Sequence, residues 1–140
     1  MKNLLLSLIC MSAVSCSTTK STIKTTSLSG TWELNYITGP RITFEGLYPR
    51  NKPTIKFDLD NKFSGNNSCN QYFGALIVTG NKINFKDSKM GMTMMACQGT
   101  GDTVYMSTLH KIDTYYVIEG GKTLRFMMGN VEMMRFTHKM

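Results

Sequence analysis

The sequence has few charged residues and no long hydrophobic segment. Only 18% of its 140 residues are charged, whereas 41% are hydrophobic, a balance that argues against an intrinsically disordered chain. No uninterrupted apolar run approaches the roughly 20 residues that a membrane-spanning helix requires. The length limits the chain to one domain and excludes a large multidomain enzyme.

Side chains for catalysis are equally sparse. His110 falls in a predicted helix and His138 among the last residues, and there is no Gly-x-Ser-x-Gly elbow, so no nucleophile and base can be assigned. Asp58 and Asp60 precede Asn61 in a pattern typical of a hairpin turn. No glycine-rich phosphate loop or zinc signature is present. We therefore expect no enzyme activity, no metal site and no cofactor.

Basic residues outnumber acidic ones, 16 to 9, which gives a net charge of +7 with histidine neutral. They are dispersed along the chain, so we expect no nucleic-acid partner. The excess of positive charge favours weak attraction to anionic lipid. We expect a monomer whose partner is an envelope protein or a lipid.

The first 15 residues have the pattern of a secretory signal peptide, in which Lys2 precedes an apolar stretch at residues 4–14. Residues 13–16 (Ala-Val-Ser-Cys) resemble the bacterial lipobox, whose cysteine is acylated and becomes the new N-terminus. We therefore predict a signal peptide at 1–15 and a membrane anchor at Cys16. The alternative is a plain signal peptide that leaves Cys16 as an unpaired thiol.

Residues 17–27 form a Ser/Thr/Lys tract that is too polar to fold. Together with Cys16 they are interpreted as a tether (16–27) to a domain at 28–140. Ser17 stands where some lipoproteins carry the aspartate that retains them at the inner membrane, which favours the outer membrane. The domain is then expected in the periplasm or at the cell surface.

Alternating apolar residues predict short, half-buried strands. The two clearest sets are Trp32, Leu34 and Tyr36, and Ile55, Phe57 and Leu59. Two-residue hairpin turns are predicted at Gly80-Asn81, Gly120-Gly121 and Gly129-Asn130, because glycine adopts positive φ without a steric penalty.

Residues 102–112 are the exception to this alternation, since Tyr105, Leu109 and Ile112 recur at helical spacing. Segments 41–52 and 87–92 are expected to be loops. The fold class is therefore mainly β: a strongly curved antiparallel sheet or partly open β-barrel of about seven strands with one α-helix.

Two cysteines, Cys69 and Cys97, remain in the predicted domain, while Cys10 would be removed with the signal peptide. Export places this pair in an oxidising compartment, and two cysteines suffice for one disulfide. The loop-entropy relation gives such a bridge about 3.5 kcal/mol of stabilisation. No Cys-x-x-Cys spacing indicates a catalytic redox pair.

Residues 65–74 surround Cys69 with short polar side chains, which hydrogen-bond nearby backbone and tolerate left-handed conformations. One interpretation is a structured turn beside the disulfide. The other is a recognition patch made of Asn66, Asn67, Asn70, Tyr72 and Phe73.

Methionines are concentrated in two places. The first group is Met90, Met92, Met94 and Met95, and the second is Met127, Met128, Met133 and Met134. Methionine readily fills irregular core space. The first group also permits two other interpretations: a Cu(I) site, since thioethers bind this ion, and an adaptable apolar groove for a partner or acyl chain.

Several segments together resemble the META domain, also called HslJ-like. They are residues 30–34 (Gly-Thr-Trp-Glu-Leu), 53–57 (Pro-Thr-Ile-Lys-Phe), 65–74 (Gly-Asn-Asn-Ser-Cys-Asn-Gln-Tyr-Phe-Gly) and 93–97 (Thr-Met-Met-Ala-Cys). Met94 stands where that family most often has arginine. The resemblance implies a curved antiparallel barrel with a helix, frequent occurrence in envelope lipoproteins linked to heat shock or antibiotic tolerance, and no established enzyme activity.

The sequence thus predicts a non-enzymatic, lipid-anchored envelope protein that acts as a stress-associated binding or structural module. The alternative is a periplasmic protein that binds a hydrophobic ligand or Cu(I) through its methionine-rich segment.

Overall fold

A computed structural model describes residues 28–140, so the predicted signal peptide, Cys16 and the tether lie outside the described residues. The strands are β1 (Gly30–Ile37), β2 (Thr54–Phe57), β3 (Lys62–Asn66), β4 (Gln71–Ala75), β5 (Ile77–Thr79), β6 (Lys82–Asn84), β7 (Met90–Met92), β8 (Thr114–Ile118), β9 (Thr123–Met128) and β10 (Val131–Lys139). The helices are α1 (Phe44–Leu47), α2 (Gly101–Leu109) and the 3₁₀ turn η1 (Glu119–Gly121).

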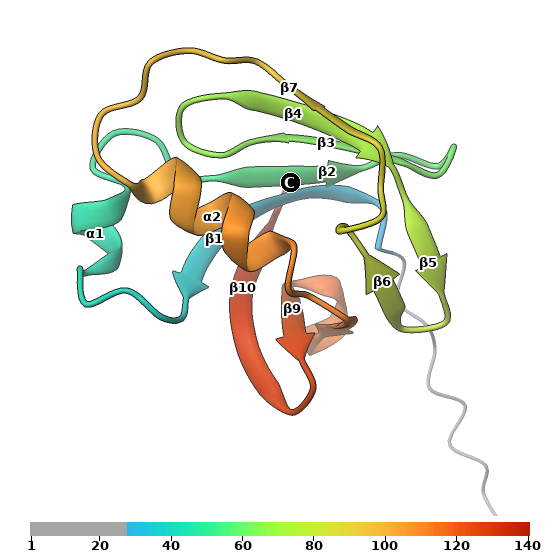
Figure 1. Cartoon of the computed structure of the whole chain (residues 1–140). Coiled ribbons are helices and arrows are strands. Elements are labelled where there is room, and N and C mark those ends of the chain that lie inside the picture. The colour runs from blue at the N-terminus through green and yellow to red at the C-terminus, as the bar shows by residue number, and fades with distance from the viewer. Residues whose placement is uncertain (1–27) are drawn as a thin grey trace, which may run out of the picture.

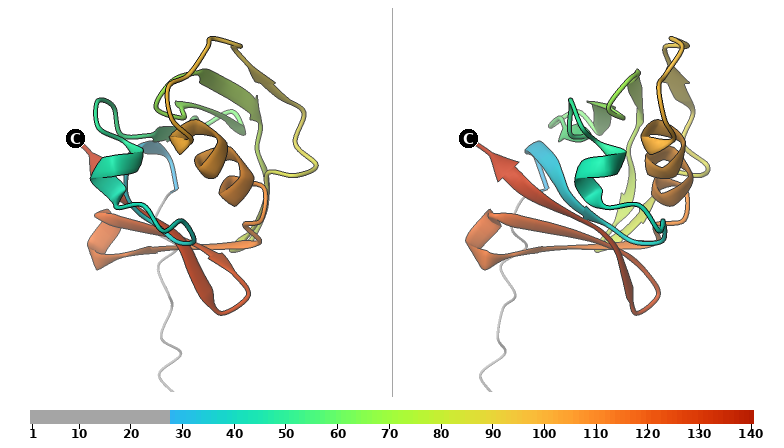
Figure 2. Two further views of the ribbon diagram at one scale, coloured as in Figure 1. Left: turned by 60° about the vertical axis from the view of Figure 1, so that its left-hand side comes forward. Right: turned by 90° about the vertical axis from the view of Figure 1, so that its left-hand side faces the viewer.

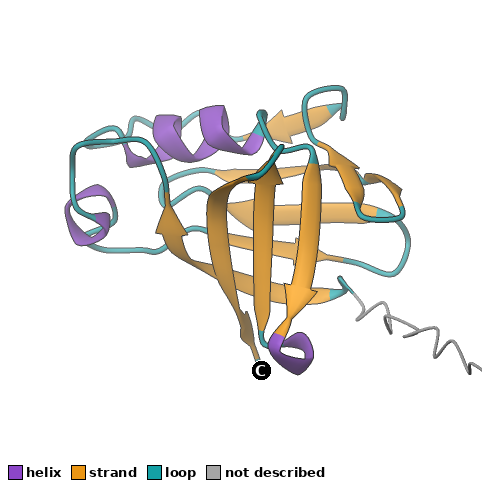
Figure 3. Ribbon diagram, turned by 90° about the horizontal axis from the view of Figure 1, so that it is seen from below, coloured by secondary structure: helices purple, strands orange, loops and turns teal. Residues whose placement is uncertain are grey.

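All ten strands belong to one antiparallel sheet in the order β5-β6-β8-β9-β10-β1-β2-β3-β4-β7 (Figure 1). Only Leu76 separates β4, beside one edge of the sheet, from β5 at the other edge. The sheet therefore has to curl until its two ends approach each other. Figures 2 and 3 show the resulting half-barrel, with α2 lying across its open side.

The predicted fold class is confirmed, but the sheet has ten strands rather than seven. β3 and β4 have no apolar alternation because glycines occupy part of the space facing the core. A Cβ on Gly65 would lie 2.5 Å from the Tyr72 hydroxyl, and one on Gly74 would lie 2.8 Å from the Phe63 ring. The aromatic rings fill the space that the glycine side chains leave.

Two segments predicted to be loops contain regular structure. Residues 41–52 include α1, a single turn whose N-cap Thr43 accepts a hydrogen bond from the Gly46 N–H at 3.1 Å. Residues 87–92 include β7, which pairs with β4 through Tyr72 opposite Met92. Both elements are too short to produce a recognisable period in the sequence.

Two of the three predicted hairpin turns are confirmed. Gly80-Asn81 joins β5 to β6 and Gly129-Asn130 joins β9 to β10, with both glycines at positive φ. The prediction at Gly120-Gly121 is wrong, because β8 already ends at Ile118 and the chain passes through η1 before β9 begins. Glu119 also adopts positive φ there, which lengthens the turn.

Two apolar side chains of the predicted half-buried strands do not lie on the buried face. Leu59 is 91% exposed because β2 ends at Phe57 and the chain turns away from the core. Tyr36 is 38% exposed, since the register of β1 against β10 shifts between Leu34 and Tyr36 and turns the later side chain outward. The bulge at Asn35 thus ends the inward alternation that begins at Trp32.

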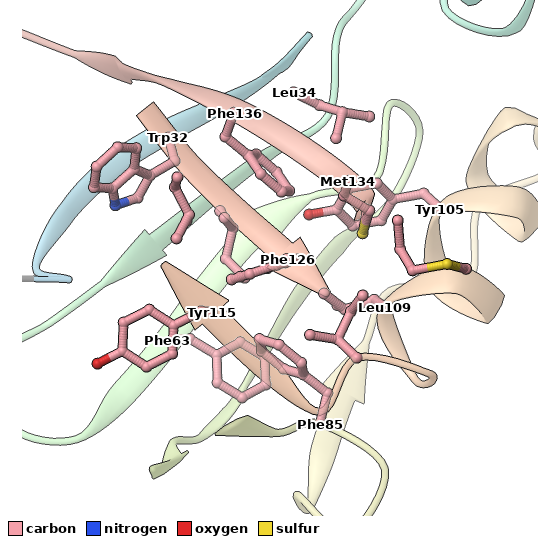
Figure 4. Close-up of a cluster of buried hydrophobic side chains, with 14 of the residues drawn as sticks. Trp32, Leu34, Phe63, Phe85, Tyr105, Leu109, Tyr115, Phe126, Met134 and Phe136 are labelled. Carbon is pink, nitrogen blue, oxygen red and sulfur yellow. The ribbon is translucent and has the colours of Figure 1, made fainter. Parts of the chain in front are cut away.

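The core fills the inside of the half-barrel (Figure 4). Phe126 is fully buried, and its ring centroid lies 5.2 Å from that of Phe136 and 5.5 Å from that of Phe85. Tyr105 and Leu109 of α2 are also fully buried, which confirms the predicted inward face of the helix. Between residues 28 and 140 no helix has the length and hydropathy needed to cross a membrane.

Candidate functional site

The structure joins Cys69 to Cys97 by a disulfide, with their Cα atoms 5.9 Å apart. Cys69 lies in the turn between β3 and β4, and Cys97 lies in the segment between β7 and α2. This is the disulfide predicted from the sequence. The bridge fastens the long connection before α2 to the β3–β4 end of the sheet.

Asn70 reinforces the same contact. Its side-chain Oδ1 accepts hydrogen bonds from the Thr93 hydroxyl at 2.9 Å and the Met95 N–H at 2.8 Å. Its Nδ2 donates to the Sγ of Cys97 at 3.1 Å. Asn70 is only 4% exposed. Residues 93–97 supply the hydrogen-bond partners that this buried amide requires, and the same bonds fix the position of that segment.

Asn67 shapes the turn itself. Its Oδ1 accepts hydrogen bonds from the N–H groups of Cys69 at 3.1 Å and Asn70 at 2.7 Å. Ser68 adopts a positive φ of 86° between them. The Nδ2 of Asn67 donates to the thioether sulfur of Met92 at 3.5 Å, so the turn is also tied to edge strand β7.

Tyr72 lies on β4, directly after this turn. Its hydroxyl donates to the Thr54 carbonyl oxygen at 2.9 Å and shares a 2.7 Å hydrogen bond with the Tyr105 hydroxyl. Burial, together with the neighbouring Tyr105, raises the pKa of Tyr72 well above its ordinary value. Both tyrosines are therefore neutral hydrogen-bonding groups that connect the sheet to α2.

The five residues of the predicted recognition patch have different environments. Asn67, Asn70 and Tyr72 are buried and make the internal contacts described above, as expected of a structured turn. Asn66 is half-buried, and its Oδ1 accepts a hydrogen bond from the Ser68 N–H at 2.7 Å. Phe73 is 62% exposed. Only Phe73 therefore presents a large surface to solvent.

Exposed apolar side chains gather along the β7 side of the sheet. Met94 is 87% exposed and Met95 is 58% exposed, and both lie within three residues of the end of β7. Phe73 packs over Gly91 of β7, where a Cβ would lie 2.6 Å from the ring. We define the methionine edge as Phe73, Met92, Met94 and Met95. The disulfide and Asn70 hold its second half in place.

In the second methionine group only Met128, on β9, is exposed, at 41%. Met127, Met133 and Met134 are buried, and Met90 packs against the core. Among residues 28–140 no three His, Cys, Asp or Glu side chains are grouped closely enough to hold a metal ion. Of the four methionines in the predicted Cu(I) site, Met92, Met94 and Met95 are exposed. The Met92 sulfur already accepts a hydrogen bond from the Asn67 amide.

The ionisable side chains of residues 28–140 do not form a recognisable catalytic group. Asp58 pairs with Lys56 at 2.9 Å and Asp60 pairs with Lys62 at 2.6 Å, on the exposed turn between β2 and β3. The ring of His138 packs edge-on against Trp32, with 4.7 Å between ring centroids. The acidic pair is thus part of a turn.

A hollow of about 390 Å³ lies between the end of α1 and the disulfide. Arg50 bridges it, since its Nη2 donates to the Gln98 Oε1 at 3.2 Å. Sequence reasoning missed this feature because Arg50 lies in a predicted loop and its contact is 48 residues away along the chain. No local pattern marks such a pair.

The META domain family model matches residues 25–140. A solved structure of a protein from Burkholderia xenovorans has a TM-score of 0.62 to this chain at 20% identity, covering 79% of this chain and 82% of that one. A duf4847 family protein from Bacteroides vulgatus has a TM-score of 0.53 at 16% identity, covering 79% and 93%. These likenesses support the fold alone. No curated protein matches the chain.

Proposed function

Because the chain belongs to the META domain family, we propose that it is a lipid-anchored protein of the bacterial envelope, in the outer membrane, that acts by binding rather than by catalysis. The lipobox at residues 13–16 supports the anchor. The Cys69–Cys97 disulfide supports a location outside the reducing cytoplasm. The link to heat shock or antibiotic tolerance rests on the family resemblance alone.

The methionine edge carries the proposal of a binding role. β7 is the last strand of the sheet and pairs only with β4 among the described strands, which leaves one side of its backbone open. An open edge can accept a further strand through main-chain hydrogen bonds. Phe73, Met92, Met94 and Met95 are all exposed beside this edge, and methionine adapts to irregular apolar surfaces.

The partner that fits this edge is an extended segment of an envelope protein with apolar side chains. Such a segment would pair with β7 and cover the exposed methionines. The interior of the half-barrel offers less support for a hydrophobic-ligand carrier, because aromatic side chains fill it. The Cu(I) alternative is retained on the exposure of Met92, Met94 and Met95.

Acyl labelling tests the anchor. Cells that express the full chain should incorporate labelled palmitate into it, and the Cys16→Ala variant should incorporate none. The Cys10→Ala variant is the matched control and should be labelled normally, because Cys10 lies inside the predicted signal peptide. Palmitate incorporation into Cys16→Ala would exclude the assigned anchor.

Crosslinking in living cells tests the binding role. A photoreactive amino acid at position 73 or 94 should capture one shared product, whereas one at Tyr116, which is 47% exposed on β8, should not. Met92→Lys, which places a charge at the open edge, should abolish capture from position 94. Equal capture from position 116, or capture that survives Met92→Lys, would contradict the proposal.

Copper titration tests the Cu(I) alternative. The mature chain without its anchor (Cys16→Ala) should bind Cu(I) no more tightly than a variant in which Met92, Met94 and Met95 are also replaced by leucine. Loss of tight Cu(I) binding in that variant would favour a metal role for the methionine edge instead.

A further inference from the structure

A second hollow continues from the one beside the disulfide. It measures about 560 Å³ and shares Arg50 and Asn51 with the first. We define the basic groove by six residues of its wall, Arg50, Asn51, Lys52, Thr54, Asn66 and Lys139. Its wall is formed by the segment that follows α1, the first residue of β2, and the last residues of β3 and β10.

The charge of this groove is not balanced from within the described residues. Glu33 is the one carboxylate in its wall, and the Nζ of Lys139 already pairs with it at 2.8 Å. Arg50 donates to the neutral amide of Gln98, and the Nζ of Lys52 lies 5.9 Å from the centroid of the Phe44 ring. Within residues 28–140 neither Arg50 nor Lys52 has a carboxylate at salt-bridge distance. Arg50 and Lys52 therefore border one concave surface whose single carboxylate, that of Glu33, is already paired with Lys139.

The donor set fits a phosphate group. A guanidinium presents a planar fork that matches phosphate oxygens, and a lysine ammonium adds a compact positive charge. The side chains of Asn51 and Thr54, which also line the groove, can donate further hydrogen bonds. A hollow of about 560 Å³ has room for a headgroup.

We propose that the basic groove binds the phosphate of an anionic lipid headgroup and thereby holds the domain against the membrane surface. This inference rests on the proposed anchor at Cys16. The twelve residues 16–27 can span at most about 40 Å, so an acylated chain would keep the groove within reach of headgroups. The resulting effective concentration makes weak electrostatic contacts sufficient. Free phosphate does not gain this effective concentration. It would bind only weakly, because the basic side chains are exposed and screened by salt.

Vesicle sedimentation tests the groove without its anchor. The probe is the mature chain with Cys16→Ala, mixed with vesicles of phosphatidylglycerol and phosphatidylcholine or of phosphatidylcholine alone. The chain should bind the anionic vesicles, and binding should weaken as salt is added. The double variant Arg50→Gln/Lys52→Gln should bind at least about tenfold more weakly, as expected for removing two basic side chains near an anionic surface.

The matched control removes the same charge elsewhere. Lys82→Gln/Lys86→Gln changes two exposed lysines at or just after β6 and should lower binding less than about twofold. An equal loss in both double variants would mean that net charge alone drives binding and would overturn the assigned groove. So would the absence of binding to anionic vesicles.

Inorganic phosphate distinguishes the two sources of the anion. Added at millimolar concentration, with ionic strength held constant, it should not displace the chain from anionic vesicles. If phosphate does displace the original chain, and the Arg50→Gln/Lys52→Gln variant no longer responds to phosphate, the groove binds free phosphate and the lipid proposal is overturned. Because the probe carries no acyl chain, failure of vesicle binding leaves the palmitate-labelling result intact, and failure of labelling leaves the vesicle result intact.

Discussion

The side-chain amide of Asn70 donates to the Sγ of Cys97 at 3.1 Å, so a buried hydrogen-bond donor rests directly on the disulfide. The same side chain accepts from Thr93 and Met95. The segment that carries Met94 and Met95 is therefore held by the disulfide and by several hydrogen bonds that the Asn70 side chain makes.

Replacing Asn70 should destabilise the domain strongly. Asn70→Ala removes the acceptor of the Met95 N–H and the Thr93 hydroxyl and the donor to Cys97, and each hydrogen bond contributes about 0.5–1.5 kcal/mol net to stability. We expect a loss of about 2–4 kcal/mol in the free energy of unfolding, measured by urea denaturation. Asn51→Ala, at an exposed position, is the control and should change stability by less than about 0.5 kcal/mol. A loss of that small size in Asn70→Ala would contradict the role assigned to this side chain.

Removing the disulfide should cost about 3.5 kcal/mol, because the bridge closes a loop with a sequence separation of 28. The comparison is urea denaturation of the oxidised chain and of the Cys69→Ala/Cys97→Ala variant. Adding a reductant should shift the unfolding midpoint of the first protein and leave that of the second unchanged. A midpoint for the oxidised chain that does not respond to reductant would mean that the bridge contributes nothing to stability.

The pair Tyr72 and Tyr105 should make the protein less stable in alkali. Burial raises the pKa of both hydroxyls above their ordinary value of about 10. The unfolded chain therefore loses these protons first, so the stabilisation is complete below about pH 10 and falls as the pH rises further. The expected slope is about 1.4 kcal/mol per pH unit for each tyrosine.

The Tyr72→Phe variant separates this effect from the titration of lysines. It is expected to be less stable at pH 8, because the Thr54 carbonyl loses its 2.9 Å hydrogen bond, and its stability should fall less steeply above pH 10. Urea midpoints between pH 8 and 11.5 measure both quantities. Parallel curves for the two proteins would show that Tyr72 does not contribute to the alkaline slope.

The sequence predicts those parts of the molecule whose pattern is local. Trp32 and Leu34 alternate along β1, and Tyr105 and Leu109 follow the helical period, so each set identifies its buried face. The strands β3 and β4 escape detection because Gly65 and Gly74 occupy space beneath aromatic rings. Their strand character depends on side chains elsewhere in the sequence.

The same limit applies to the sites. The cysteine pair could be predicted because only two cysteines remain in the domain. The basic groove could not, because Arg50 approaches Gln98 and Lys139 only after the sheet has curled. The predicted recognition patch consists of neighbours in sequence, yet Tyr72 and Phe73 point to opposite faces of β4, and only Phe73 is exposed to solvent.

Oxidation should distinguish the methionine edge from the methionines of the core. Hydrogen peroxide transfers one oxygen atom to a thioether sulfur and its O–O bond breaks, which yields a sulfoxide and water, so the rate depends on access to the sulfur. Met94 and Met95 are 87% and 58% exposed, whereas Met133 and Met134 are 8% and 0% exposed. In the folded chain Met94 and Met95 should therefore be oxidised at least about tenfold faster, as measured by mass spectrometry of peptides at successive times. In urea the four rates should converge, because unfolding exposes every sulfur. Oxidation of Met134 as fast as Met94 without denaturant would mean that the half-barrel opens readily, which would contradict the packed core from which the exposed edge is inferred.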